Sequence, residues 1–248
     1  MSISIILSRK EMVMKLSSRL QAIADFIPSN TIVADIGTDH GYIPAYLIQN
    51  KIAKRVIATD LSENSLQKTI HLIKELDLEN YIDVRLGDGL EVIKPFEVDT
   101  VIISGMGGLL IRDILDKDRH KRDSITHFIL QPNIASDELR KYLYDNSFTI
   151  LGEKLIKEDG KFYEIIYAKK GKSYVKDPIY YEIGEKLILN KDPLLREYIN
   201  HKIDVFKHIM QEIRDKTTEK SRARYEEVEG EIKKLKEVLA KIEGNRDN

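Results

Sequence analysis

The chain has no cysteine among its 248 residues. This absence excludes disulfides, thiolate nucleophiles and cysteine-ligated zinc, and we expect no metal site. The chain also lacks a charge bias, because 40 Lys and Arg side chains nearly balance 41 Asp and Glu side chains. A basic surface for an anionic partner must therefore be local, since the average charge does not supply one.

Long apolar runs are absent as well. Residues 2–8 (SISIILS) are rich in apolar side chains, but Arg9 and Lys10 follow them, which reverses the order of a secretory leader. No other run approaches the roughly 20 apolar residues that cross a membrane. We therefore expect a soluble, cytoplasmic protein with no membrane partner. The length suffices for one sizeable core domain and a smaller second one.

The middle of the chain alternates strand-like apolar runs with amphipathic segments, as in a parallel sheet that helices cover on both faces. Strands are predicted over residues 31–36, 55–60, 82–88, 98–104 and 126–132. Helices are predicted over residues 42–50, 62–77, 109–116 and 136–146. Two further strand-like runs flank the turn dipeptide Asp159-Gly160 within residues 148–169 and indicate a terminal antiparallel hairpin. The predicted fold class is α/β, with a doubly wound, Rossmann-like, mostly parallel sheet.

After Gly171 the apolar residues recur at steps of three and four, which is typical of amphipathic helices. One stripe runs from Leu195 to Ile213 and a second from Tyr225 to Ile242. A C-terminal α-helical, coiled-coil-like hairpin is the simplest model, so the predicted domains are residues 1–171 and 172–248. The heptads fit helices that grip a partner as well as helices that pack on the core or on a second copy, so we expect a monomer or a weak dimer.

A glycine loop follows the first predicted strand, in the segment ADIGTDHGYIP (34–44). Ligands of a doubly wound sheet bind at the carboxyl ends of the strands, so this loop lies where a nucleotide-like cofactor would be held. Gly37 permits a tight turn, and Gly41 permits a close approach of backbone or ligand where the helix begins. Asp35 and Asp39 would repel a pyrophosphate but attract a sulfonium and an ammonium group. The loop therefore favours S-adenosyl-L-methionine as cofactor.

The ends of the next strands agree with this cofactor. Asp60 follows the loop by about 20 residues and can accept hydrogen bonds from both ribose hydroxyls. Asp88, beside Gly89, can accept one from the adenine amino group, and Leu61 can pack on the purine face. The segment SGMGG (104–108) ends the fourth strand, where a methyl acceptor would meet the cofactor. An aspartate alone is more often a cap or turn residue, but the ordered series favours a cofactor site.

Seven segments together resemble the bacterial tRNA (adenine-22-N1)-methyltransferase family: LSSRLQAIADFIP, ADIGTDHGYIP, ATDLS, GDGLEV, ISGMGG, ILQPN and DGKFYEI. The resemblance covers essentially the whole chain and implies a class I methyltransferase domain followed by a helical domain. It implies methyl transfer from S-adenosyl-L-methionine to N1 of adenine 22 in tRNA. The cofactor-binding positions that it implies are Asp35, Gly37, Asp39, Gly41, Asp60, Leu61, Asp88, Gly89, Gly105 and Met106.

The chemistry of adenine N1 fits this reading. N1 has an in-plane lone pair, so its methylation needs placement of the base more than a strong general base. The candidate catalytic residues are Asp39, as a carboxylate near the developing positive charge, Asn133, for the base edge, and Tyr42, for stacking. The chain lacks the Asn/Asp-Pro-Pro-aromatic signature typical of N6-methylating enzymes, which favours N1. N1 lies on the Watson–Crick edge, so the base must be unpaired before it reacts.

An RNA partner should leave a trace of positive charge. Basic side chains gather in the predicted N-terminal helix and in the segment KDRHKRD (117–123), which is predicted as a loop. The candidate phosphate contacts are Arg9, Lys10, Lys15, Arg19, Arg119, Lys121 and Arg122. Because acids accompany these cations, the second segment is also consistent with an ordinary solvated loop.

Two other functions remain open on the sequence. A methyltransferase that acts on a small molecule or a protein explains the cofactor loop, but it gives the C-terminal helices no role beyond a lid or dimerisation. A non-catalytic RNA-binding protein that retained a cofactor fold explains the helices. It does not explain Asp60 and Asp88, because such a protein has no need for ribose and adenine acceptors.

Overall fold

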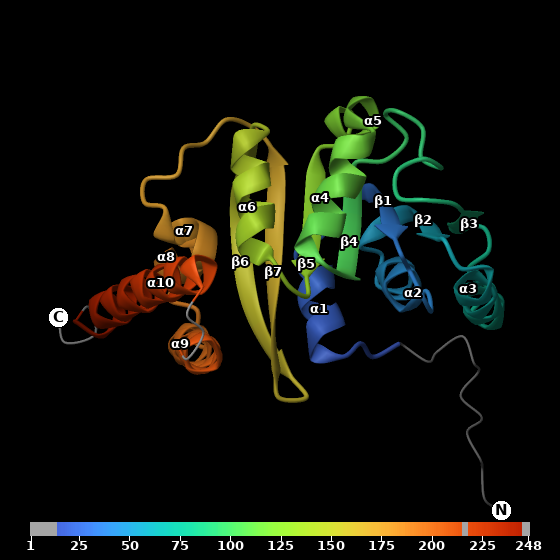
Figure 1. Cartoon of the computed structure of the whole chain (residues 1–248). Coiled ribbons are helices and arrows are strands. Elements are labelled where there is room, and N and C mark those ends of the chain that lie inside the picture. The colour runs from blue at the N-terminus through green and yellow to red at the C-terminus, as the bar shows by residue number, and fades with distance from the viewer. Residues whose placement is uncertain (1–13, 215–217, 245–248) are drawn as a thin grey trace, which may run out of the picture. The chain divides into compact units, whose positions relative to one another are not determined.

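The structure is a computed structural model that describes residues 14–214 and 218–244 (Figure 1). The chain divides into two compact units, Met1–Tyr174 and Val175–Asn248. The boundary predicted after residue 171 falls between the last strand, which ends at Lys170, and the first helix of the second unit, which begins at Ile179.

Seven strands form one sheet in the order β3-β2-β1-β4-β5-β7-β6. Strands β1 to β5 are parallel, whereas β7 is antiparallel to β5 and β6 is antiparallel to β7. The predicted mostly parallel sheet with a terminal hairpin is confirmed. The strands are β1 (Thr31–Ile36), β2 (Ala53–Asp60), β3 (Ile82–Leu86), β4 (Thr100–Met106), β5 (His127–Pro132), β6 (Phe148–Glu158) and β7 (Lys161–Lys170).

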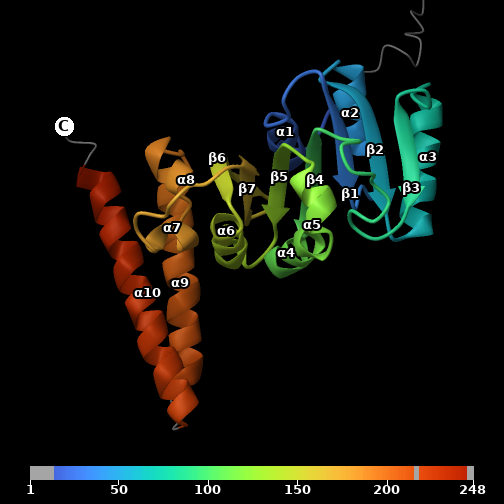
Figure 2. The same ribbon diagram turned by 90° about the horizontal axis from the view of Figure 1, so that it is seen from above.

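Helices cover both faces of this sheet, with α1 and α2 on one side and α4 and α6 on the other (Figure 2). Side-chain caps fix two of the starts, since Ser17 Oγ accepts from the Leu20 N–H and Ser62 Oγ from the Ser65 N–H. The helices of the first unit are α1 (Ser18–Ala24), α2 (Tyr42–Gln49), α3 (Glu63–Glu75), α4 (Gly108–Lys117), α5 (Arg119–Asp123) and α6 (Ser136–Asp145).

Two apolar cores lie on the two faces, and alternate residues of each central strand enter them. In β4, Val101 and Ile103 join the core under α4 and α6, whereas Ile102 joins the core under α1 and α2. All three side chains are 0% exposed. Full burial of such a side chain contributes about 2 kcal/mol each, which explains why the buried strands read as continuous apolar runs.

Strand β4 runs two residues beyond its predicted end at Ser104, and the reason is a bulge. The pairing of β4 with β5 shifts register between Ser104 and Met106, and Gly105 there has φ +75°. A residue without a side chain adopts this backbone easily, so the strand continues to Met106. The bulge lies where the strand order reverses about β1, which is the usual place for a ligand in such a sheet.

The second unit is helical. It contains α7 (Ile179–Glu182), α8 (Glu185–Leu189), α9 (Leu195–Ile213) and α10 (Glu219–Gly244), and the last two lie side by side (Figure 2). The predicted pair of long helices is confirmed. Helices α7 and α8 were not predicted, because segments of four and five residues are too short to show a helical period. The buried apolar side chains of the long pair are Leu195, Tyr198, Ile199, Ile203, Val228, Ile232, Leu235 and Val238.

Candidate active site

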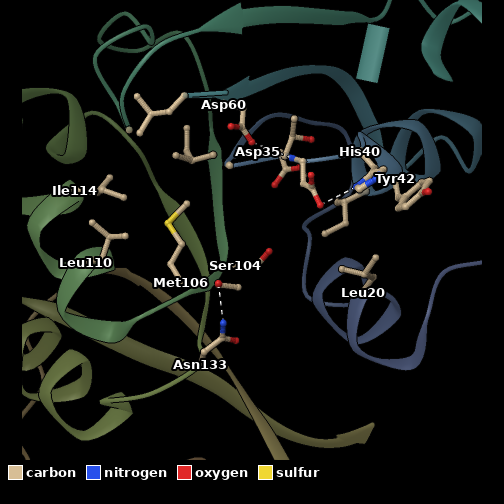
Figure 3. A pocket seen from close by; sticks show the side chains of 18 of the residues that line it. Leu20, Asp35, His40, Tyr42, Asp60, Ser104, Met106, Leu110, Ile114 and Asn133 are labelled. Carbon is tan, nitrogen blue, oxygen red and sulfur yellow. Dashed lines mark hydrogen bonds and ion pairs between the residues drawn. The ribbon is translucent and has the colours of Figure 1, made fainter. Parts of the chain in front are cut away.

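A pocket of about 610 Å³ opens at the carboxyl ends of the central strands (Figure 3). It is lined by residues of α1, of β1 and the loop after it, of the turns after β2 and β3, of the β4 bulge, of α4 and of β7, and by Asn133 just after β5. Of the predicted cofactor positions, nine line it: Asp35, Gly37, Asp39, Asp60, Leu61, Asp88, Gly89, Gly105 and Met106. The predicted catalytic residues Asp39, Tyr42 and Asn133 line it too. The loop after β1 and the ends of the neighbouring strands therefore bring these residues together in one pocket.

The two glycines of the first loop have different structural roles. Gly37 has φ +76°, and a Cβ there would lie 2.5 Å from Met106 Cε inside the pocket. Gly41, the tenth predicted cofactor position, is not among the lining residues. A Cβ at Gly41 would lie 2.7 Å from Thr69 Cγ2, so its small size lets the start of α2 approach α3. The close approach expected at Gly41 is therefore between two helices and not between the backbone and a ligand.

Acidic side chains dominate the charge of the pocket, with Asp35, Asp39, Asp60 and Asp88 in its lining. Asp35 is 3% exposed, and its burial raises the pKa of the carboxyl to about 6, with a further rise from the charge of Asp60. A cationic ligand would offset both effects. These carboxylates therefore suit the sulfonium and ammonium groups of S-adenosyl-L-methionine and not a pyrophosphate.

Asp35 makes stability depend on pH in a direction opposite to that of most surface carboxylates. Its folded-state pKa is raised, so the folded state holds a proton between pH 3.8 and about 6 that the unfolded chain has lost. The free energy of unfolding falls as the pH rises through this window and stays low above it. We expect Asp35→Asn to raise the free energy of unfolding at neutral pH by about 2 kcal/mol.

Urea unfolding of the cofactor-free wild type and of Asp35→Asn, followed across this pH range, checks the expectation. The stabilisation should be absent at the acid end, grow up to about pH 6 and then remain constant. A difference between the two proteins that is the same at every pH would show that ionisation of Asp35 is not its cause.

Asp60 ties the end of β2 to the glycine loop. One carboxylate oxygen accepts from the Ser62 N–H at 2.7 Å, and the other accepts from the Asp39 N–H at 3.2 Å. Asp39 itself has φ +53°, in the left-handed region that few residues other than glycine adopt. The neighbouring Leu61 is 70% exposed and offers an apolar surface to a ligand.

The carboxylate of Asp39 is engaged by its neighbours. Its Oδ2 lies 2.7 Å from His40 Nδ1, and its Oδ1 lies 4.0 Å from Lys68 Nζ. The His40 ring is stacked on Tyr42, with 5.3 Å between the ring centroids and 8° between the planes. His40 therefore links the predicted carboxylate to the predicted stacking residue at one side of the pocket (Figure 3).

Asp88 lies in the turn after β3, because the strand ends at Leu86 and not at the predicted residue 88. Its Oδ2 accepts from Lys117 Nζ at 2.7 Å, and the same ammonium contacts Glu91. The sequence did not indicate this pairing, since Lys117 lies at the far end of α4. A ligand amino group at Asp88 would share the carboxylate with Lys117.

Asn133 stands at the opposite side of the pocket, just after β5. Its Nδ2 donates to the Gly105 carbonyl at 2.7 Å, and its Oδ1 accepts from Gln131 Nε2 at 3.0 Å. Sequence reasoning missed Gln131, which is 0% exposed. The available signal was a polar residue inside the otherwise apolar strand HFILQP, because a buried amide requires partners.

Comparison with known proteins settles the family. The family model described as tRNA (adenine(22)-N(1))-methyltransferase (TrmK) matches residues 33–237. The chain belongs to this family. It is 40% identical over 158 residues to tRNA (adenine(22)-N(1))-methyltransferase of Bacillus subtilis (strain 168). That alignment spans 64% of this chain and 66% of the relative, just under two thirds of its length.

Solved structures from the TrmK family are similar over almost the whole chain. The crystal structure of the B. subtilis m1A22 tRNA methyltransferase TrmK has a TM-score of 0.82 and 33% identity, and the match covers 91% of this chain and 99% of that one. TrmK of M. capricolum, in complex with the cofactor product S-adenosyl-homocysteine, has a TM-score of 0.81 and 29% identity, with coverage of 92% and 100%. The family membership predicted from the seven sequence segments is therefore confirmed.

The predicted phosphate contacts of this TrmK-family chain lie in different settings. Arg9 and Lys10 lie outside the described residues. Lys15 is exposed and precedes α1, so it is not part of the helix in which it was predicted. Arg19 belongs to α1, but its guanidinium lies in the wall of the pocket, 5.2 Å above the Tyr163 ring.

The basic segment after α4 forms the short helix α5, so the prediction of a loop is wrong. Asp118 begins this helix, because its carboxylate accepts from the Lys121 N–H at 3.1 Å. Arg122 is 4% exposed and donates to Tyr142 Oη at 2.8 Å. A buried guanidinium cannot reach a phosphate on the surface, so Arg122 does not enter the RNA interface that we propose for this TrmK-family chain.

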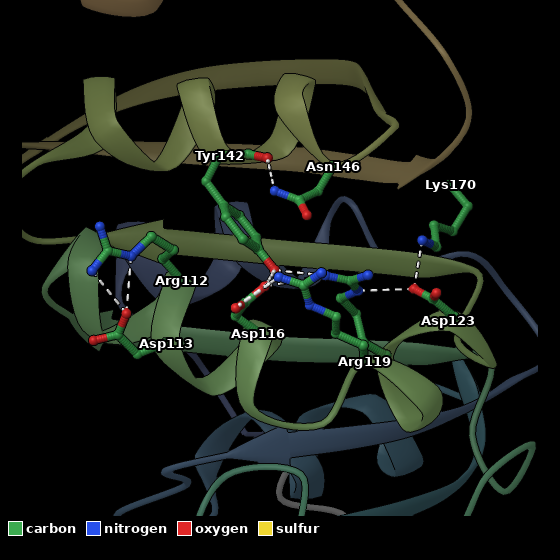
Figure 4. A network of polar contacts seen from close by, with 9 residues as sticks. Arg112, Asp113, Asp116, Arg119, Asp123, Tyr142, Asn146 and Lys170 are labelled. Atoms are coloured by element: carbon green, nitrogen blue, oxygen red, sulfur yellow. Dashed lines mark hydrogen bonds and ion pairs between the residues drawn. The ribbon is translucent and has the colours of Figure 1, made fainter.

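The exposed Arg119 and the half-buried Lys121 of the same segment face carboxylates. Arg119 lies 2.8 Å from Asp116 and holds the pKa of that carboxyl below its ordinary value. Lys121 Nζ lies 3.0 Å from Asp118. Figure 4 shows Asp116, Arg119 and Tyr142 within one polar network. An RNA phosphate would therefore compete with acids that are already in place.

Two further expectations concern what the fold does not carry. Within residues 14–214 and 218–244, no group of three or more His, Asp and Glu side chains is placed to hold a metal ion. In that same part of the TrmK-family chain, no helix is both long and apolar enough to cross a bilayer.

Proposed function

We propose that this chain transfers a methyl group from S-adenosyl-L-methionine to N1 of adenine 22 in bacterial tRNA. The observation that carries the proposal is one pocket with two chemically different sides. Carboxylates from β1, β2 and the turn after β3 line one side, and the amide of Asn133 lines the other. The first suits a cationic nucleoside cofactor and the second suits a base edge. Membership of the family supports the same substrate.

The carboxylates of the pocket determine how the cofactor binds in this proposal. Asp60 holds the ribose hydroxyls, Asp88 the adenine amino group and Leu61 the purine face, while Asp35 faces the positive groups. Gly37 and Gly105, both at positive φ, leave room where a side chain would enter the pocket. When bound, the cofactor supplies a methyl group on a sulfonium, which is an electrophile that needs no activation by a protein acid.

The base side of the pocket must position an unpaired adenine. N1 carries its own lone pair, so no residue has to remove a proton before methylation. The base lies between the two sides of the pocket: Asn133 contacts its edge from one side, and Tyr42, stacked on His40 at the opposite side with Asp39, offers a ring to its face. Asp39 places a negative charge where the methylated base becomes cationic. These assignments make Asp39, Tyr42 and Asn133 the catalytic residues.

The second unit supplies further contacts to tRNA. Lys191, Arg196 and Lys241 lie around a pocket of about 130 Å³ among its helices, beside the acids Asp177 and Asp192, and these cations are the groups we assign to tRNA phosphates. Lys15, Arg119 and Lys121 add phosphate contacts in the first unit. We place the protein in the cytoplasm, with domains at residues 1–171 and 172–248, as a monomer or a weak dimer.

Transfer of a labelled methyl group tests the proposal. The enzyme is incubated with S-adenosyl-L-methionine and a tRNA transcript that carries adenosine at position 22, and with a matched transcript that carries guanosine there. Label should enter the first transcript only. Equal label in both would move the target to another nucleotide. Binding of the cofactor with no label in either would favour a small-molecule or protein substrate.

A further inference from the structure

A buried amide connects Arg19 to the base side of the pocket. Gln131 Oε1 accepts from Arg19 Nη1 at 2.7 Å and from the Gly105 N–H at 3.2 Å. Gln131 Nε2 donates to Asn133 Oδ1 at 3.0 Å, and Asn133 Nδ2 donates to the Gly105 carbonyl at 2.7 Å. The four residues come from α1, β4, β5 and the turn after β5, so the network depends on the tertiary fold.

The chemistry of the groups gives this network one direction. A guanidinium has only donors, and so has the backbone N–H of Gly105. The oxygen of Gln131 must therefore face both, and its NH₂ group must face Asn133. The oxygen of Asn133 then faces Gln131, and its NH₂ group faces the Gly105 carbonyl. The backbone N–H and carbonyl of Gly105 favour the same direction, and Arg19 reinforces it with a charged donor to Gln131 Oε1, which holds the Asn133 amide through Gln131.

Asn133 keeps one unused acceptor position and one unused donor. It is exposed and lines the pocket, so a base can reach both. A donor and an acceptor side by side match N7 and the N6 amino group of adenine, and this contact leaves N1 free. Guanine presents acceptors at both N7 and O6, so the oxygen of a fixed Asn133 would face O6 unfavourably.

Arg19 is itself held in place. Its guanidinium lies 5.2 Å above the Tyr163 ring, and its backbone N–H donates to Glu158 Oε2 at 3.0 Å, at the end of β6. The side-chain contact can thus be removed while the backbone anchor of α1 remains. This separates an effect on Asn133 from an effect on folding.

We propose that Arg19 is a positioning residue that orients the Asn133 amide to read N6 and N7 of the target adenine. The inference rests on the proposed function and replaces the phosphate contact expected for Arg19. It assigns the selection of adenine over guanine to Arg19, which does not contact the base. Arg19 contacts Gln131, and Gln131 contacts Asn133, the residue that reads the base.

A thermodynamic cycle tests this inference, in which Arg19 of the enzyme and N7 of the substrate adenine are changed separately and together. The kcat/KM values of wild type and Arg19→Met are measured on tRNA transcripts with adenosine or 7-deazaadenosine at position 22. Loss of N7 should lower wild-type kcat/KM about tenfold, within the discrimination expected of a bidentate amide contact. Arg19→Met should lower kcat/KM on adenosine severalfold and show a clearly smaller loss on the 7-deaza base than the wild type does, because the Gly105 backbone alone holds the Asn133 amide less firmly. Because ratios are compared, any change in N1 reactivity cancels.

Matched variants keep the test sharp. Arg55→Met, which removes an exposed arginine near the start of β2, should show the full wild-type loss on 7-deazaadenosine. Arg19→Gln, whose amide can present a donor or an acceptor, should reduce that loss as Arg19→Met does. Arg19→Gln replaces Arg19→Met in the test if the Met variant does not fold. Cofactor affinity should be unchanged in both Arg19 variants.

Two outcomes would overturn the inference. A wild type that methylates both transcripts equally well would exclude the contact with N7. An unchanged 7-deaza loss in a folded, cofactor-binding Arg19 variant would exclude the route through Gln131. A wild type that methylates neither transcript would overturn the proposed function, and the inference with it.

Discussion

Replacing Asp60 by alanine is expected to weaken binding of S-adenosyl-L-methionine by at least about 100-fold if Asp60 holds the ribose as proposed. Two hydrogen bonds from ribose hydroxyls to a charged acceptor contribute about 1.5–3 kcal/mol each, and the variant loses both. It also releases the Ser62 and Asp39 N–H groups that the carboxylate holds. The glycine loop then loses its link to β2, which adds to the loss of affinity. Isothermal titration of the variant and the wild type measures the effect.

Asp113→Ala is the matched control. Asp113 is an exposed aspartate on α4 that pairs with the neighbouring Arg112 at 2.8 Å and does not line the pocket. Its removal should leave cofactor affinity unchanged. A dissociation constant for Asp60→Ala within a factor of three of the wild-type value would contradict the assignment of Asp60 to the ribose.

Gly108→Ala is expected to lower the free energy of unfolding by about 3 kcal/mol and to abolish most methyl transfer. A Cβ at Gly108 would lie 2.1 Å from the Ala135 carbonyl oxygen and 3.0 Å from that of Ile134. Both obstacles are backbone atoms, so no side chain can rotate away. Ala135 is already at φ +56°, which leaves the turn little freedom to move.

The expected damage reaches the site because this contact joins two loops of the pocket. The Gly108 N–H donates to the Ile134 carbonyl at 2.8 Å, and Asn133 immediately precedes Ile134. The adjacent glycine gives a strict control. A Cβ at Gly107 would meet only Ile134 side-chain atoms at 3.6 Å or more, so Gly107→Ala should fold and methylate normally. Thermal unfolding of both variants decides the point, and equal melting temperatures would contradict the contact.

The part of the pocket that carboxylates line could be predicted from the sequence because its determinants are local. Apolar runs locate the buried strands, and each aspartate or glycine that follows one comes to the same edge of the sheet. Asp35, Asp60 and Asp88 were found in this way. The predicted strand ends at residues 88 and 104 were wrong by two residues, since a turn and a bulge change strand length without changing the pattern of apolar residues.

The surroundings of Asn133 could not be predicted in the same way, because they are set by distant contacts. Arg19 and Gln131 are 112 residues apart in the chain, and nothing in either local pattern indicates that they meet. The burial of Arg122 against Tyr142 is a similar case. A charged residue in a sequence is usually expected at the surface, but a long basic side chain such as that of arginine can be buried when carboxylates and hydroxyls surround it.

Primer extension on methylated tRNA tests the central claim most directly. A methyl group on N1 blocks Watson–Crick pairing, so reverse transcriptase should stop at adenine 22 after treatment with the enzyme and S-adenosyl-L-methionine. The account predicts a new stop at that position, absent without the cofactor and absent from a transcript with guanosine there. Methyl incorporation at adenine 22 without a stop would place the methyl group on another atom and contradict the account.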